Sequence, residues 1–206
     1  MTFDFYSFRF VFSAIDPILF PEGQPGNILR GAFGNVFRGV ICADDCPGAR
    51  ACPSRESCDY ARIFEPSVSG NGPSGLRDRP RPFVFRAAYL DGRKVQPGER
   101  FWFDVHLFET RNPPLESFAS AFARLAKDGL GPLRGRADLV SVEQRPVSIS
   151  LDGNPQDVRC ARVEFVTPTE LKSADRLADR PEFGVLFARA RDRVSALRTL
   201  YGAGPL

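Results

Sequence analysis

The residues best suited to chemistry are four of the five cysteines, which stand together in the stretch CADDCPGARACPSRESC as Cys42, Cys46, Cys52 and Cys58. Zinc sites usually take a pair of ligands from a C-x2–4-C spacing, which Cys42 and Cys46 satisfy, whereas the second pair is more widely spaced. We expect a structural zinc ion that orders a loop with no apolar core of its own. The alternatives are unligated thiols, a lost site closed by disulfides and, last, an iron–sulfur cluster.

The cellular compartment bears on this choice. The N-terminal stretch MTFDFYSFRFVFSA alternates in polarity, which predicts a strand and not a signal peptide. No apolar run approaches the ~18–20 residues that span a bilayer. We therefore predict a cytoplasmic protein with no membrane partner, in which reduced thiols favour metal ligation over disulfides. Cys160 falls in a predicted strand and is expected to be a small buried residue.

Groups able to transfer a proton near neutral pH are scarce. The chain has one histidine, His106, within the stretch FWFDVHLFE. Its neighbours Val105 and Leu107 point to the other face of the predicted strand. A single strand histidine is more typical of a packing or surface residue than of a catalyst. No catalytic residue is assigned on this basis.

Arginine is the other residue type in this sequence that could take part in binding. The net charge is +3, and only three of the 28 basic residues are lysines. Arginine suits phosphate through its planar fork, although a GC-rich genome produces the same bias. In GLGPLRGR, the glycines Gly129, Gly131 and Gly135 could bring backbone amides to a phosphate, together with Arg134 and Arg136. The simpler interpretation is a helix that ends at Gly129 before a tight turn.

The elements that must position these residues alternate between strand and helix. The order strand, helix, strand, strand, helix, strand is the ferredoxin-like βαββαβ arrangement, an α+β fold whose antiparallel sheet carries two helices on one face. Gly31 and Gly34 inside the first helix suggest the close approach of another backbone. The first helix is expected to be capped by Asn27. We predict strands at 3–12, 83–89, 100–109 and 136–144, and helices at 27–41 and 115–128.

The remainder of the chain resembles its own beginning. Strands are predicted at 147–151 and 158–166, and a Pro-containing loop and a helix at 181–200 follow. We predict a first domain at 1–146 with a cysteine-rich insertion (42–58) and a mobile loop (66–82), and the start of a second, incomplete ferredoxin-like domain at 147–206. Either these last elements pack onto the first domain or the chain is a piece of a longer protein, and we favour the second.

Four segments in this order resemble the CRISPR RNA-processing endoribonucleases of the RAMP superfamily, in the branch with a cysteine cluster after the first helix. The resemblance implies two tandem ferredoxin-like domains that bind repeat RNA and cut it without a metal, by attack of a ribose 2′-hydroxyl on the adjacent phosphate. It implies CRISPR repeat RNA as the partner, with other effector subunits as further partners. The segments are PGNILRGAFGNVFRGVIC (25–42), CDYARIFEP (58–66), SFASAFARLAKDGLGPLRGRADLVSV (117–142) and VEFVTPTELK (163–172). We expect RNA contacts from Arg30, Arg38, Gly131, Arg134, Arg136 and Lys172.

Two departures from the family bear on activity. Relatives often carry a histidine in the stretch written here as GAFGNVF, where this chain has Asn35, and asparagine cannot exchange a proton near neutral pH. The relatives' C-terminal glycine-rich loop has no counterpart in this sequence. We therefore expect RNA binding with slow cleavage or none. The alternatives are a non-catalytic RNA-binding or scaffolding subunit with a structural metal loop and, last, a domain that binds a small ligand or a protein on its sheet face.

Overall fold

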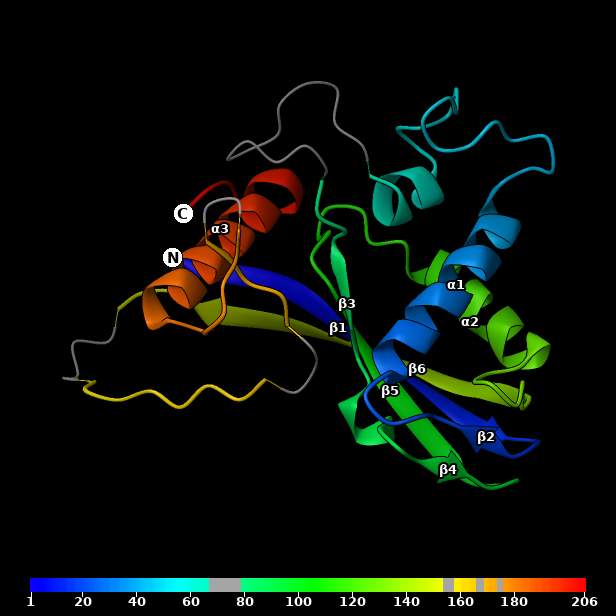
Figure 1. Cartoon of the computed structure of the whole chain (residues 1–206). Coiled ribbons are helices and arrows are strands. Elements are labelled where there is room, and N and C mark those ends of the chain that lie inside the picture. Colours follow the sequence, from blue (N-terminus) through cyan, green and yellow to red (C-terminus); the bar gives the residue numbers. More distant parts are fainter. Residues whose placement is uncertain (67–78, 154–157, 166–168, 174–175) are drawn as a thin grey trace.

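A four-stranded antiparallel sheet with two helices on one face forms the centre of the computed structural model (Figure 1). The structure describes residues 1–66, 79–153, 158–165, 169–173 and 176–206. The strands run in the order β3-β5-β1-β6, and every neighbouring pair is antiparallel. This is the ferredoxin-like strand order, so the predicted α+β fold class is confirmed. The elements are β1 (Thr2–Ala14), α1 (Pro25–Ile41), β3 (Phe83–Arg86), β5 (Arg100–Leu107), α2 (Leu115–Asp128) and β6 (Ala137–Ser150).

Smaller elements complete the described chain. The predicted strand at 83–89 ends at Arg86, and a short 3-10 helix, η3, follows. The expected strand at 158–166 is not formed, because residues 158–165 have no regular structure and residue 166 lies outside the described residues. Most of the predicted loop at 66–82 also lies outside them. The smaller elements are β2 (Ile18–Leu19), η1 (Tyr60–Phe64, a π-helix), η3 (Ala88–Leu90), β4 (Lys94–Val95), β7 (Lys172–Ser173), β8 (Arg176–Leu177) and α3 (Phe183–Tyr201).

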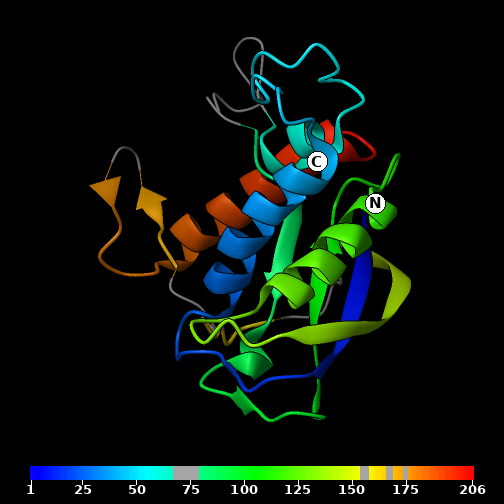
Figure 2. The same cartoon turned by 90° about the vertical axis from the view of Figure 1, so that its right-hand side faces the viewer.

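Figure 2 shows α1 and α2 side by side on one face of the sheet. The core between these helices and the sheet is built from phenylalanine rings. Alternate residues of a strand share a face, which turns every second residue of β1 and β5 toward the helices. Phe122 of α2 is central, since its ring lies 4.4 Å from Phe10 and 4.6 Å from Phe33 of α1, measured between ring centroids. Each fully buried ring stabilises the fold by about 1.5–3 kcal/mol relative to an exposed one. The completely buried rings in this layer include Phe8, Phe10, Phe12, Phe33, Phe37, Phe101, Phe103, Phe118 and Phe122.

The first helix begins earlier than its sequence suggests. Pro25 occupies its first turn, where a fixed φ and a missing N–H are both tolerated. Asn27, the expected cap, therefore lies inside the helix, and that prediction was wrong. The expected close approach occurs at Gly34 only, where a Cβ atom would overlap the ring of Phe64 from η1. The neighbour is thus a side chain and not a backbone, and nothing lies within 4 Å of a Cβ at Gly31.

The last strand of the sheet is longer than predicted. The two strands expected at 136–144 and 147–151 form one strand, β6, which pairs with β1 from Ala14 back to Thr2. Pro146 lies within it opposite Tyr6, which an edge strand tolerates because the missing N–H can face outward. β6 therefore runs across position 146, and the division into two domains stays a prediction.

The C-terminal end of helix α3 is held by hydrogen bonds to the segments that precede β3 and follow β5. The Tyr201 hydroxyl donates to the Pro80 carbonyl at 2.9 Å, and Arg111 donates to the Leu200 carbonyl at 2.6 Å. At the other end Phe183 and Phe187 are 69% and 56% exposed. Among the described residues, no helix is long and apolar enough to cross a membrane.

Candidate nucleic-acid interface and cysteine site

The face of the sheet turned away from α1 and α2 is polar and aromatic. We call it the open face, and it comprises Ser7, Arg9, Val11, Arg86, Trp102, Asp104, His106, Glu143 and Arg145, whose register positions alternate with those of the core residues. One row crosses all four strands with alternating charge, in the order Arg86, Asp104, Arg9, Glu143. Arg9 forms two hydrogen bonds with Asp104, at 2.8 and 3.0 Å, and this pairing raises the pKa of the guanidinium.

An aromatic stack lies at one end of the open face. The ring of Tyr89, from η3, lies 4.4 Å from that of Trp102, with an angle of 18° between the two planes. The guanidinium of Arg9 lies 5.5 Å from the Trp102 ring, and that of Arg93 lies 5.5 Å from the Tyr89 ring. Burial raises the pKa of Tyr89 to about 12, so its hydroxyl stays neutral near pH 7. Aromatic rings flanked by arginines are the groups on which nucleic-acid bases stack.

His106 also belongs to the open face. It pairs with Ser7 on one side and with Val84 on the other, and its ring lies 4.9 Å from that of Phe5. Burial lowers the pKa of the imidazole, and the nearby charge of Arg86 lowers it further. Asn35 is exposed on α1, which packs on the opposite face of the sheet. The two residues weighed for proton transfer are therefore on different sides of the sheet.

The glycine-rich turn after α2 packs tightly against the β2 segment. Cβ atoms at Gly131 and Gly135 would overlap the carbonyl oxygens of Leu19 and Pro17 respectively. The amides of Leu130 and Gly135 donate to each other's carbonyls, at 2.8 and 3.1 Å. These two amides are thus already paired, and the tight packing explains why glycine occupies both positions.

The predicted RNA contacts fall in three places. Arg136 pairs with Asp16 at 2.7 Å while its side chain stays 58% exposed, and Arg134 donates to the Asp128 carbonyl at 3.2 Å. Arg30 and Arg38 are exposed on α1. Lys172, at the start of β7, pairs with Glu170 at 3.2 Å, and Figures 1 and 2 place the strands β7 and β8 away from the turn after α2. The roles of these residues stay predictions.

The four clustered cysteines line one pocket of about 470 Å³, together with Asp45, Ser57 and Asp59. Burial raises the pKa of Cys42 to about 11, and the neighbouring thiols Cys46 and Cys58 contribute to the rise. The Ser54 amide lowers the pKa of Cys52, but burial and the neighbouring thiols raise it above its usual range. The four side chains therefore share one environment although the chain between them is irregular.

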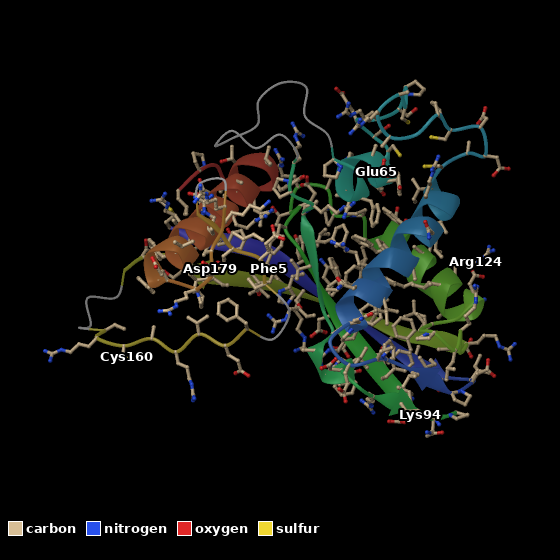
Figure 3. The ribbon with its side chains drawn as sticks, in the orientation of Figure 1. Phe5, Glu65, Lys94, Arg124, Cys160 and Asp179 are labelled. Atoms are coloured by element: carbon tan, nitrogen blue, oxygen red, sulfur yellow. The ribbon has the colours of Figure 1, made fainter. Side chains whose placement is uncertain are left out.

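The donor set of this pocket fits a thiolate-binding metal, because four sulfurs are the ligand set of structural zinc. All five cysteines are free thiols. Among the residues the structure describes, no three His, Cys, Asp or Glu side chains stand in an arrangement that could hold a metal ion. Binding of a metal ion would thus require the cysteine loop between α1 and η1 to bring its sulfurs closer together. Cys160 lies outside this pocket and is exposed, contrary to prediction, on the segment without regular secondary structure shown in Figure 3.

The model of the family AF_1859_N, described as an N-terminal domain, matches residues 3–163. The chain belongs to the AF_1859_N family. The AF_1859_N match contains α1, α2, the cysteine stretch, strands β3, β5 and β6, and β1 from Phe3 onward. No curated protein matches the chain.

The open face of this AF_1859_N domain carries residues that sequence reasoning missed. Alternation in the strand RFWFDVHL buries Phe101 and Phe103 on one face and places Trp102 and Asp104 on the other face. This pattern is visible in the sequence and could have indicated both residues. Alternation does not place Tyr89, because Tyr89 lies in a 3-10 helix and not in the strand predicted at 83–89.

Proposed function

We propose that this chain is an RNA-binding domain of the CRISPR RNA-processing type and that single-stranded RNA lies on its open face. The observation that carries the proposal is the Tyr89–Trp102 stack with Arg9 and Arg93 beside it. Four-stranded sheets of this topology can bind RNA by stacking bases on exposed aromatic side chains. The resemblance of four segments to RNA-processing endoribonucleases supports the same class of ligand.

The predicted contacts Arg134 and Arg136 extend this surface around one end of the sheet. Trp102 lies near the start of β5, two residues from Arg100, whose partner on β1 is Ser13. Arg136 immediately precedes β6, whose first residues pair with the same end of β1. RNA that stacks on Trp102 can therefore continue toward the turn after α2, where arginine contacts would hold phosphates.

Affinity on this surface is expected to be modest and dependent on salt. Asp104 and Glu143 offset part of the positive charge of Arg9, Arg86 and Arg145. The arginine–phosphate contacts that remain displace counterions from RNA, so binding weakens as salt increases.

Cleavage by this chain is proposed to be slow or absent. The family's reaction needs a base that takes the proton of the 2′-hydroxyl while that oxygen attacks phosphorus, and an acid that protonates the leaving 5′-oxygen. Asn35 cannot exchange a proton, and it lies on α1, across the sheet from His106 and the open face. The two positions therefore cannot act on one phosphate as base and acid. This arrangement favours the second candidate, a non-catalytic RNA-binding or scaffolding subunit that works with other effector subunits.

The cysteine pocket is proposed to hold a structural zinc ion in a cytoplasmic protein. Cys42, Cys46, Cys52 and Cys58 would be the ligands, and the metal would order the loop between α1 and η1. Purified protein should contain about one zinc per chain by elemental analysis. Removal of the metal should loosen this loop and leave the sheet folded, because the four cysteines are not among the buried core residues, although Cys42 and Cys58 pack against them.

Titration of labelled CRISPR repeat RNA at several salt concentrations tests the proposed function. Fluorescence anisotropy should show binding whose affinity falls as salt rises, and the Arg134→Ala/Arg136→Ala variant should show a shallower salt slope. The His106→Ala variant should bind as the unaltered chain does, because His106 lies toward the other end of β5 from Trp102 and the turn after α2. Binding that does not depend on salt, or no binding at all, contradicts the proposal. A cut at one position of the repeat, lost in His106→Ala, would show that the histidine is catalytic.

A further inference from the structure

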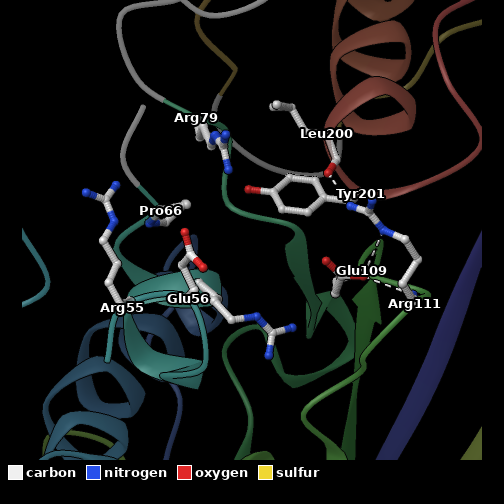
Figure 4. A pocket seen from close by; sticks show the side chains of 10 residues that line it. Arg55, Glu56, Pro66, Arg79, Glu109, Arg111, Leu200 and Tyr201 are labelled. Atoms are coloured by element: carbon white, nitrogen blue, oxygen red, sulfur yellow. Dashed lines mark hydrogen bonds and ion pairs between the residues drawn. The ribbon is translucent and has the colours of Figure 1, made fainter. Parts of the chain in front are cut away.

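A second pocket, of about 380 Å³, lies between η1, the end of β5 and the C-terminal end of α3 (Figure 4). Its charged lining consists of four arginines and two glutamates, and we call it the arginine pocket. It is separate from both the open face and the cysteine pocket. The charged residues are Arg55, Glu56, Arg62, Arg79, Glu109 and Arg111.

Two of the arginines are held in place by the surrounding chain. Arg62 forms an ion pair with Asp59 at 2.9 Å and donates to the Asn112 carbonyl at 2.9 Å. Arg111 donates to the Leu200 carbonyl at 2.6 Å and lies 3.7 Å from Glu109. Each guanidinium has five N–H donors, so both retain donors for a ligand. A guanidinium that is already positioned loses less conformational entropy when it binds.

The carboxylate of Glu109 is engaged and does not fill the pocket. Its side chain is 9% exposed, and one oxygen accepts the backbone N–H groups of Arg111 at 2.9 Å and Asn112 at 3.3 Å. Glu109 thus orients the loop that carries Arg111. Glu56 is then the carboxylate that opposes an anionic ligand.

Arg79 has the guanidinium that is most available to a ligand in this pocket. Within the described parts of the chain it forms no hydrogen bond and no ion pair. In Figure 4 its guanidinium points into the pocket beside the ring of Tyr201. The Tyr201 hydroxyl is fixed by its bond to the Pro80 carbonyl, next to Arg79 in the chain. Counted over the described residues, the pocket therefore presents one guanidinium without a partner together with two that are anchored.

We infer that the arginine pocket binds a phosphate monoester, with Arg79 and Arg111 as its principal ligands. Guanidinium groups pair with phosphate through two parallel hydrogen bonds, which makes arginine the side chain best suited to this group. The volume is within the range of small-ligand pockets, so the phosphate can carry a nucleoside. Free phosphate, a nucleotide and the phosphorylated end of an RNA share this chemistry.

Isothermal titration calorimetry of the whole chain tests the inference with three probes. These are inorganic phosphate, a nucleoside 5′-monophosphate and the matching nucleoside. The two phosphates should bind and the nucleoside should not. The Arg79→Gln variant should bind both at least about tenfold more weakly, since it loses a charge-assisted contact. Arg124→Gln is the matched control, because it removes the same charge from an exposed position on α2.

The outcomes separate the sources of the phosphate and the ways in which the inference fails. Tighter binding of the monophosphate than of inorganic phosphate identifies a nucleotide site, and equal binding identifies a site for phosphate alone. Preference for 5′-phosphorylated over 5′-hydroxyl RNA, lost in Arg79→Gln, identifies an RNA end. Equal weakening by Arg79→Gln and Arg124→Gln, or no binding of either phosphate, overturns the inference. Because RNA on the open face is measured with other variants, failure here leaves that proposal standing.

Discussion

The two faces of the sheet are made from the same strands but differ in burial and in polarity. On the covered face, Phe10 and Phe103 are essentially inaccessible and contact Phe122 of α2. On the open face, Arg9 and Asp104 alternate with them along the same strands and keep 37% and 23% of their side chains exposed. The alternation of side chains separates stability from recognition. Changes on the covered face should affect folding, and changes on the open face should affect binding.

The largest effect is expected from the centre of the covered face. Phe122→Ala would leave a cavity among the rings of Phe10, Phe33 and Phe103. Loss of a buried aromatic ring costs about 3–5 kcal/mol. Urea unfolding followed by circular dichroism measures the change in the free energy of unfolding. A loss below about 1 kcal/mol would mean that α2 does not pack on the sheet as described.

Two glycines of α1 give a matched pair on the covered side. Gly34→Ala would place a Cβ atom into the ring of Phe64, and overpacking of this kind costs about 1–3 kcal/mol. Gly31→Ala has open space and should be neutral or stabilising, by up to about 1 kcal/mol, because alanine is the better helix former. The melting temperature should therefore fall in Gly34→Ala and stay unchanged or rise in Gly31→Ala. Equal effects would show that η1 does not pack at Gly34.

On the open face, Asp104→Asn should change binding more than stability. A partly exposed ion pair contributes at most about 1 kcal/mol, so the loss of stability should be small. The substitution removes a negative charge and leaves Arg9 free to contact phosphate. RNA affinity should rise in an anisotropy titration, and the salt slope should steepen. Unchanged affinity would place the RNA elsewhere.

A smaller effect is expected from the single histidine. The pKa of His106 lies below its ordinary value of 6.5, so the folded state favours the neutral imidazole. The stabilisation is complete above pH 6.5 and is lost as the pH falls below 6.5 toward the folded pKa, because the unfolded chain then binds more protons. His106→Gln should remove this part of the acid sensitivity. Unfolding curves between neutral and mildly acid pH measure it, and identical slopes would contradict the lowered pKa.

The covered face was largely predictable and the surface sites were not. Regular spacing of Phe33 and Phe37, and the alternation in β1, indicated the helices and the sheet because burial imposes a period on the sequence. The exposed position of Cys160 was not predicted, since alternation alone does not show whether a strand finds a partner. Neither the Tyr89–Trp102 stack nor the arginine pocket was predictable, because each brings together segments that are distant in sequence or irregular.

The most direct test of the open face uses Trp102 as its own probe, since it is the only tryptophan in the chain. Single-stranded repeat RNA is titrated while intrinsic fluorescence and the anisotropy of labelled RNA are followed together. We expect stacking of bases to quench the Trp102 signal, with the same midpoint as the anisotropy change and with reversal by salt. RNA binding that leaves the fluorescence of Trp102 unchanged would contradict the account and place the interface on another surface.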